Sequence, residues 1–282
     1  MKSSIEVQGV TMRFGGVTAL REVNLSLEGQ KIVGLLGRNG AGKTTLLSLM
    51  TNRLFPSEGQ VLLDGENVRE NDAALSKIFY MGEKNPYLDT TTVAQLFRYT
   101  ASFYPGFHAD KAAALAERFE LDVKKKLKNL STGYLTIAKL VTALATDVPY
   151  LLFDEPVLGL DANHRELFYR MLVEDYSERP RTIVLSTHLI EEIADIIEQV
   201  VILKDGQILL DKPAEEVTRM GFAVSGKAAD VEAFCRGRDL LSMETLGGLK
   251  TACLLGKAGD VPPELEVSRL DMQKLFVRLT NA

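Results

Sequence analysis

The clearest chemical signal in the sequence is a glycine-rich loop that ends in a lysine and two threonines. Residues 37–44 read GRNGAGKT and match the pattern GxxxxGK[ST]. Glycines let the backbone curl so that successive N–H groups point at phosphate oxygens, and the start of a following helix adds free donors. The loop therefore predicts a site for a nucleoside triphosphate. The residues expected to bind it are Gly37, Asn39, Gly40, Ala41, Gly42, Lys43, Thr44 and Thr45.

The side chains that follow the last glycine of this loop have distinct expected roles. Lys43 is expected to place its charge on the β- and γ-phosphates and to act in catalysis. The Thr44 hydroxyl is expected to bind Mg²⁺, and Thr45 can reach the α-phosphate. A plain glycine-rich turn with an exposed lysine is the alternative, but it leaves the flanking strand and helix patterns unexplained. The loop predicts a nucleotide and no particular reaction.

Two carboxylates follow a strongly apolar segment further along the chain. Residues 150–153 read YLLF and lead directly into Asp154 and Glu155. Strands of α/β sheets end at the crevice that binds ligands, so both carboxylates are expected there. We expect Asp154 to hold Mg²⁺ and Glu155 to orient, or take a proton from, the water that attacks the γ-phosphate. Adjacent strand residues point to opposite faces, so the strand end must turn both toward the site.

A histidine and a serine complete the candidate set. His188 follows the apolar segment 182–186 and is expected to hydrogen-bond the γ-phosphate as a catalytic residue. His108 and His164 lack such a context and are expected at the surface. Ser131 precedes a helical pattern, where the free amides of the first turn suit an anion, although a simple helix cap explains this residue equally well.

The elements that must position these residues alternate between strands and helices, which predicts an α/β layered sheet with parallel strands. Proline and glycine near residues 213–221 indicate a boundary, after which short strand patterns and an amphipathic stretch follow. The lysine-rich run 124–128 is interpreted as the solvated end of a helix. Strands are expected at 5–7, 23–27, 31–36, 60–63, 150–153 and 182–186, with a hairpin at 200–210, and helices at 44–53, 93–103, 109–119, 132–144, 163–176 and 188–196.

Composition excludes several classes of protein. The chain has 282 residues, of which 46% are hydrophobic and 25% charged, so it is neither disordered nor a coiled coil. A net charge of −5 disfavours a constitutive nucleic-acid binder. The first residues lack the apolar core of a signal peptide, and no apolar run is long enough to span a bilayer. Cys235 and Cys253 match no metal or redox spacing and are expected to be reduced.

The order of these motifs resembles the ATP-binding subunit of an ABC transporter over residues 4–211. The resemblance implies a P-loop NTPase α/β sheet with an antiparallel β subdomain and a helical subdomain at about 84–145. The cassette would span residues 1–216, and residues 217–282 would form a small α+β accessory domain. The motifs that carry the resemblance are the glycine-rich loop, LSTGY at 130–134, YLLFDEP at 150–156, GLD at 159–161 and STH at 186–188.

The resemblance also implies roles for individual residues. Phe14 would stack on adenine, and Asp161 would lie in a loop that couples two sites. Ser131 and Gly133 would contact the γ-phosphate of ATP held by a second subunit. Glu83 falls where the family has a glutamine, and it would be a Mg²⁺ ligand. The implied cofactors are ATP and Mg²⁺.

Partners and location follow from the same resemblance. The chain would pair with a copy of itself or with another cassette, and residues 84–128 would meet separately encoded transmembrane permease subunits. It would bind no nucleic acid, would reach the membrane only through its partners, and would lie in the cytoplasm, peripheral to the cytoplasmic face of the cell membrane. Export is favoured by the short C-terminal tail, and residues 272–279 resemble a terminal helix of bacterial exporter ATPases. A generic amphipathic packing helix is the alternative for that segment.

Three departures from the family pattern keep other functions open. Thr132 and Tyr134 replace a glycine and a glutamine, and Glu83 adds negative charge beside ATP. Thr132 adds a Cβ where the backbone must approach phosphate, which would slow closure. The alternatives are a soluble ABC-type ATPase, or a regulatory nucleotide-binding module with slow turnover.

Overall fold

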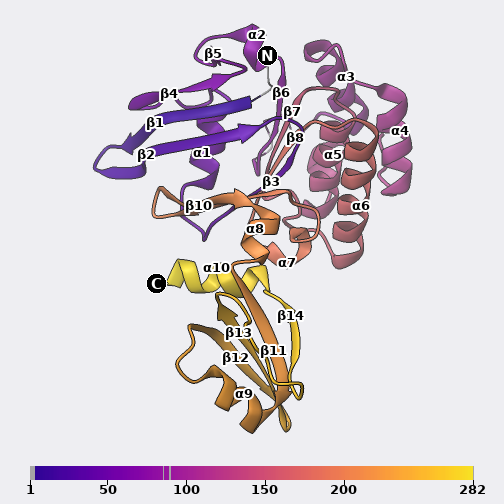
Figure 1. Ribbon diagram of the computed structural model, residues 1–282. Helices are drawn as coiled ribbons and strands as arrows, with labels where there is room; N and C mark the ends of the chain where they lie inside the picture. The colour runs from indigo at the N-terminus through magenta and orange to yellow at the C-terminus, as the bar shows by residue number, and fades with distance from the viewer. Residues whose placement is uncertain (1–3, 85, 89, 282) are drawn as a thin grey trace.

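A six-stranded sheet forms the centre of the computed structural model, which describes residues 4–84, 86–88 and 90–281 (Figure 1). The ends of the predicted domains, at residues 1 and 282, lie outside this range. The strand order is β10-β9-β3-β8-β7-β6, and all neighbours are parallel except β9 and β10. The predicted α/β parallel sheet is confirmed. The strands are β3 (Ile32–Leu36), β6 (Ile78–Met81), β7 (Tyr150–Asp154), β8 (Thr182–Thr187), β9 (Gln199–Lys204) and β10 (Gln207–Pro213).

The strands β3, β7 and β8 are buried along their whole length because both faces of the sheet are covered. Every residue of these three strands is buried. Helices lie on both sides of a parallel sheet, so the strands bury both faces and lose the alternation of a half-exposed strand. This burial explains why the sequence shows them as continuous apolar runs.

A second, antiparallel sheet packs beside the first and has the order β2-β1-β4-β5. Its strands are β1 (Ser4–Phe14), β2 (Val17–Glu28), β4 (Glu58–Leu63) and β5 (Glu66–Asn67). The first two are much longer than the predicted strands at 5–7 and 23–27. Register shifts between Val7 and Arg13 break the alternation, and Gly9 has a left-handed φ of 58°, so periodicity reveals only part of each strand.

Helices cover the central sheet. Near the N-terminal half are α1 (Lys43–Met50) and α2 (Asp72–Leu75); further along are α3 (Val93–Phe103), α4 (Ala109–Arg118), α5 (Thr132–Leu144), α6 (Ala162–Glu178) and α7 (Ile190–Ile193). The helices α3, α4 and α5 lie together at one side of the sheet, next to β6 (Figure 1). Thr92 starts α3 with a capping box that includes Gln95.

Two predicted helices end earlier than the sequence indicates. The helix predicted at 44–53 ends at Met50, because Asn52 takes a left-handed φ of 54°. The helix predicted at 188–196 is reduced to α7, and turns follow so that Ile193 and Ile197 can pack against Gly34 of β3.

The lysine-rich run 124–128 is exposed as predicted, but it does not end a helix. The helix α4 ends at Arg118, and Glu120 then takes a left-handed φ of 52°. The run continues through a bridge between Lys126 and Thr92 into a 3-10 turn, Leu127–Asn129, whose first side chain is buried. Leu127 therefore anchors a loop with exposed lysines on either side.

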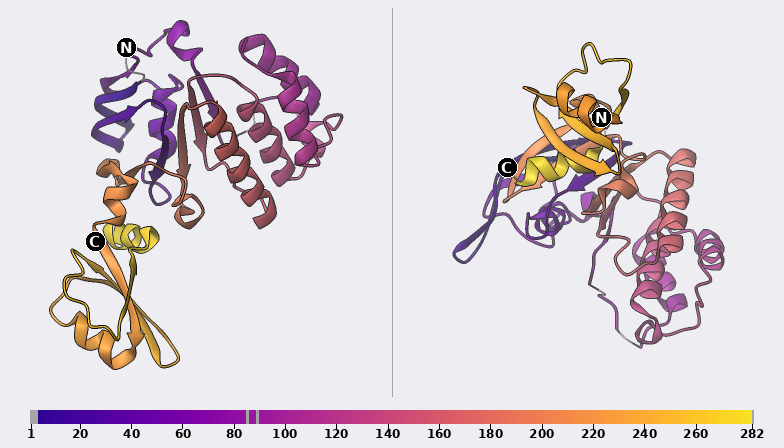
Figure 2. Two further views of the ribbon diagram at one scale, coloured as in Figure 1. Left: turned by 45° about the vertical axis from the view of Figure 1, so that its right-hand side comes forward. Right: turned by 90° about the horizontal axis from the view of Figure 1, so that it is seen from below.

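The chain after β10 forms a third sheet below the other two (Figures 1 and 2). A short helix α8 (Ala214–Thr218) leads into β11 (Gly221–Lys227), α9 (Ala228–Cys235), β12 (Leu240–Leu246), β13 (Leu249–Leu255), β14 (Glu266–Arg269) and α10 (Met272–Asn281). The strands are antiparallel in the order β12-β13-β11-β14. The helix α9 packs on β11 and β13, and α10 packs between β12 and α7.

The last helix also joins the third sheet to the main body. Leu275 and Phe276 of α10 are buried in the same apolar cluster as Ile193 and Ile197. Arg38 of the glycine-rich loop donates a hydrogen bond to Asn281 Oδ1 at 2.8 Å.

Cys235 and Cys253 are buried free thiols, as the sequence predicts. Within the described ranges, no helix is long and apolar enough to cross a membrane.

Candidate active site

The glycine-rich loop joins the end of β3 to the start of α1. Glycine is required at two of its positions. A Cβ at Gly37 would lie 2.7 Å from the carbonyl oxygen of Leu203, and Gly42 has a φ of 108° that L side chains rarely adopt. Lys43 is buried and folds back over the loop, where its Nζ donates to the Gly37 carbonyl at 2.8 Å. The loop and its lysine therefore form one compact cradle at the carboxyl end of a buried strand.

The two predicted carboxylates lie at the end of β7, and the backbone turns sharply between them. Asp154 is the last strand residue, whereas Glu155 has a left-handed φ of 48°. Adjacent side chains of a regular strand point to opposite faces, so this turn is what allows both carboxylates to face the site. The Glu155 amide donates to the Ser186 carbonyl at 2.9 Å, which fixes the turn against β8.

Glu155 lies between two predicted catalytic residues. Its Oε1 is 3.4 Å from Nζ of Lys43, and its Oε2 is 3.0 Å from Nδ1 of His188. The Glu155 side chain is 17% exposed and His188 is 45% exposed, so the carboxylate is sheltered and the imidazole faces the open side. The structure thus brings together all three residues that the sequence predicts as catalytic.

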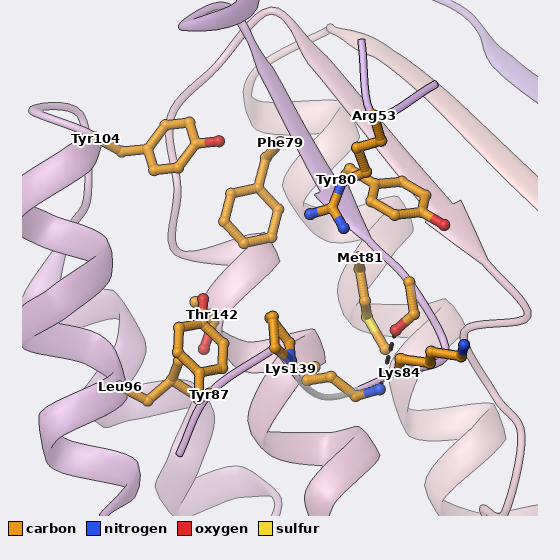
Figure 3. A pocket seen from close by; sticks show the side chains of 12 residues that line it. Arg53, Phe79, Tyr80, Met81, Lys84, Tyr87, Leu96, Tyr104, Lys139 and Thr142 are labelled. Atoms are coloured by element: carbon orange, nitrogen blue, oxygen red, sulfur yellow. Dashed lines mark hydrogen bonds between the residues drawn. The ribbon is translucent and has the colours of Figure 1, made fainter. Parts of the chain in front are cut away.

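Asp154 is held by two hydroxyl groups that the sequence analysis missed. Ser186 Oγ donates to its Oδ1 at 3.0 Å, and the Tyr80 hydroxyl donates to its Oδ2 at 3.3 Å. Burial and the neighbouring Asp154 carboxylate raise the pKa of Tyr80 above its ordinary value, so this hydroxyl stays protonated. The Arg53 guanidinium lies 4.6 Å from the centre of the Tyr80 ring (Figure 3). The strand pairing of β6 with β7 places Tyr80 here.

Glu83 lines the same cavity as the two carboxylates. The cavity has a volume of about 130 Å³ and is also lined by Thr132 and Lys139. Oxygen donors such as the Asp154 carboxylate and the Thr44 hydroxyl suit Mg²⁺. Glu155 Oε1 is buried without a hydrogen-bond partner in the described part of the chain, which leaves an acceptor for a bound water or ion.

The protein groups alone do not make a closed metal site. Among the described residues, no three of the types His, Cys, Asp and Glu are grouped as metal ligands. Mg²⁺ usually keeps several waters and binds one or two protein oxygens together with substrate phosphates. The residues present therefore fit an ion that arrives with a nucleotide.

Other predicted residues lie on separate elements. Thr44 and Thr45 are in the first turn of α1, and Phe14 ends β1 with 47% of its surface exposed. Ser131 caps α5, and its Oγ accepts from the Tyr134 amide at 3.3 Å. Ser131 lines a different cavity, of about 340 Å³, together with Lys125 and Asn129.

Gly133 and His164 lie near the loop that contains Asp161. A Cβ at Gly133 would be 2.9 Å from the Gly159 carbonyl oxygen, so the start of α5 packs directly on this loop. His164, which was expected at the surface, is partly buried, and its Nδ1 lies 2.8 Å from Asp161 Oδ2. Hydrogen bonds from His164 lower the pKa of Asp161. The sequence shows no signal for this pairing except the three-residue spacing at a helix start.

A buried parallel strand that ends in this cradle, with paired carboxylates at the end of another strand of the same sheet, defines a P-loop nucleoside triphosphate hydrolase. The family model described as ABC transporter matches residues 20–158. The ABC transporter ATP-binding protein YtrB of Bacillus subtilis is 31% identical over 89% of this chain and 86% of its own length. The ATP-binding protein NatA of the same organism is 30% identical over 68% of this chain and 81% of its own length.

Solved structures share the fold. An ATP-binding subunit of an ABC transporter aligns with a TM-score of 0.69 and 22% identity over 76% of this chain and 92% of the other. A dimeric bacterial ABC transporter cassette aligns with a TM-score of 0.67 and 25% identity over 74% of this chain and 98% of the other. The chain belongs to the family of ABC transporter ATP-binding proteins, and its enzymatic activity is ATP hydrolysis.

Proposed function

We propose that this chain binds MgATP on the loop 37–44 and hydrolyses it with Glu155 as the residue that orients the attacking water. The observation that carries this proposal is the position of Glu155 between Lys43 and His188. A Glu155→Gln variant should lose about 100-fold or more of the ATPase rate and keep ATP binding. Glu178→Gln, at an exposed site at the end of α6, is the matched control and should keep the full rate. An unchanged rate in the Glu155 variant would contradict the assignment.

Each side chain has a defined task in this scheme. The Lys43 ammonium group donates to the Gly37 carbonyl and can donate to phosphate oxygens instead, because both are hydrogen-bond acceptors. The hydroxyls of Ser186 and Tyr80 fix the Asp154 carboxylate, which together with Thr44 would hold Mg²⁺; when bound, that ion neutralises phosphate charge. His188 Nδ1 lies 3.0 Å from Glu155 Oε2, and an N–H at this nitrogen would donate to the carboxylate and orient it.

We also propose that two cassettes close around ATP. Ser131 and Gly133 lie on α5 and pack toward the loop with Asp161, whereas Lys43 lies on α1. This separation supports a role for Ser131 and Gly133 on the γ-phosphate of ATP held by a second subunit, either a copy of this chain or another cassette. Phe14, exposed at the end of β1, would stack on the adenine of its own ATP. In this proposal, a nucleotide-dependent closed pair is the working state.

The membrane partner is a further proposal. Closure would act on separately encoded transmembrane permease subunits through the helices near residues 84–128, so that the chain is peripheral on the cytoplasmic face of the membrane. The cavity between β6 and the helices α3 and α5 is lined by several aromatic side chains (Figure 3), and this lining supports a docking role for this side. Residues 1–216 would form the cassette and residues 217–282 an accessory domain, supported by the third sheet that begins at Gly221.

We propose export as the direction of transport. The support is the helix α10 (Met272–Asn281), which contains the segment 272–279 that resembles a terminal helix of exporter ATPases. The names of several relatives favour the opposite direction, among them the taurine import ATP-binding protein of Jannaschia, which is 29% identical over 81% of this chain and 87% of its own length. Transport measured in vesicles that contain the reconstituted complex decides the direction. ATP added on the side of this subunit should drive substrate away from that side, and movement toward it would contradict export.

A further inference from the structure

Lys139 extends from the middle of α5 to the loop that carries Glu83. Its Nζ donates to the Gly82 carbonyl at 3.0 Å, the dashed line of Figure 3, and to the Glu83 carbonyl at 2.7 Å. Gly82 and Glu83 directly follow β6, and Ser131 caps the helix that bears Lys139. One side chain therefore connects the loop with Glu83 to the helix that begins at Ser131.

The charge of Lys139 lies in a strongly acidic place. The cavity of about 130 Å³ that Lys139 lines also includes the carboxylates of Glu83, Asp154 and Glu155. Burial lowers the pKa of Lys139, and the nearby Glu83 carboxylate opposes this change. A buried ammonium group is costly unless its donors are satisfied, and here two carbonyl oxygens satisfy it.

We infer that Lys139 is a positioning residue for ATP hydrolysis, one that fixes the Glu83 backbone to α5 and offsets the negative charge of the Glu83 carboxylate next to ATP. This inference rests on the proposed function and on the role that the family resemblance implies for Glu83 as a Mg²⁺ ligand at the bound ATP. Because the ammonium group bonds to backbone carbonyls, it holds the loop whatever side chain stands at position 83. Its charge matters only where that side chain is a carboxylate. The two roles can therefore be separated by substitution.

The positioning role is tested by hydrogen exchange in the full chain. Lys139→Met keeps an unbranched side chain but removes all donors, and Lys139→Arg keeps donors and charge. We expect the amides of residues 82–84 to exchange about tenfold faster in the Met variant and to be largely restored in the Arg variant. Equal exchange in the wild type and the Met variant would contradict the positioning role. If the Met variant does not fold, Lys139→Leu, which also lacks side-chain donors and charge, replaces it.

The charge role is tested by ATP binding in the presence of EDTA, so that no metal and no turnover contributes. Lys139→Met should weaken ATP binding about five- to tenfold, and adding Glu83→Gln should restore most of the affinity, because residues in contact are energetically coupled. If Lys139 were purely structural, Lys139→Met would weaken ATP binding by the same factor with and without Glu83→Gln. That result would overturn the inference. The hydrolysis test of Glu155→Gln is independent of this outcome, so failure of the proposed function is recognised separately.

Discussion

Oε1 of Glu155 lies 3.4 Å from Nζ of Lys43, although 111 residues lie between them in the sequence. The parallel order β3-β8-β7 brings the carboxyl ends of their strands to one edge, and the left-handed turn at Glu155 completes the approach. The lysine proposed to hold the γ-phosphate and the carboxylate proposed to activate water therefore lie side by side at this edge. Further consequences of this arrangement can be measured.

The first prediction concerns the shape of the loop. Gly37→Ala places a methyl group 2.7 Å from the Leu203 carbonyl oxygen, a backbone atom that cannot move aside easily. We expect ATP affinity to fall at least about tenfold, with a lower melting temperature, because the overlap distorts the cradle. Gly248→Ala is the matched control, since its Cβ meets open space and its φ is not left-handed. Equal ATP affinities in the two variants, measured by calorimetry, would refute this explanation.

A second prediction concerns the Tyr80 hydroxyl. Tyr80→Phe removes one of the two donors to Asp154 and should lower kcat about tenfold, since a hydrogen bond to a charged group contributes about 1.5–3 kcal/mol. The raised pKa keeps the hydroxyl protonated, so the loss should be the same from pH 6 to about pH 10. Tyr99→Phe, at an exposed tyrosine of α3, should have no effect. A loss in Tyr80→Phe that disappears at high pH would show that Tyr80 ionises, contrary to this account.

The third prediction tests the partner of Glu155. His188→Ala removes the group 3.0 Å from Glu155 Oε2, and we expect kcat to fall about 100-fold with little change in KM. The control is His108→Ala, because that imidazole is exposed and lies outside the site. Steady-state ATPase kinetics of both variants provide the comparison. A change confined to KM would mean that His188 only helps to bind ATP.

A fourth prediction concerns stability away from the site. Asp175 is buried and accepts hydrogen bonds from Lys111 and from the buried Arg181. Asp175→Asn should lower the free energy of unfolding by about 3–5 kcal/mol, because it leaves a buried guanidinium without its counter-charge. Glu174→Gln breaks an exposed pair with Arg118 and should cost about 0–1 kcal/mol. Urea unfolding of the two variants measures the difference, and similar midpoints would argue against a structural ion network.

The sequence indicated which residues gather at the candidate site, because the proposed chemistry depends on residue types at fixed positions, and the structure brings Lys43, Glu155 and His188 together. The loop 37–44 and the pair Asp154 and Glu155 stand next to buried strands whose apolar runs are visible in the sequence. The lengths of β1 and β2 could not be predicted, because register shifts near Val7 and Val10 interrupt the alternation. The short α7 could not be predicted either, because its end is set by packing of Ile197 against Gly34.

Residues that act through tertiary contacts were missed for a related reason. Nothing near Tyr80 in the sequence shows that β6 will pair with β7 and place its hydroxyl on Asp154. His164 was expected at the surface, yet it lies 2.8 Å from Asp161 and packs beside Tyr134. Local pattern identifies the residues that carry chemistry, whereas the residues that orient them depend on which strands and helices become neighbours.

The central proposal is that ATP closes two cassettes around the site, and the first partner to test is a second copy of this chain. The most direct test is the molar mass of the Glu155→Gln variant by light scattering, with and without MgATP. Because the variant should bind ATP without hydrolysing it, the account predicts a monomer without nucleotide and a dimer of twice 31.1 kDa with it. A variant that binds ATP and stays monomeric at every concentration would contradict closure of this chain on itself.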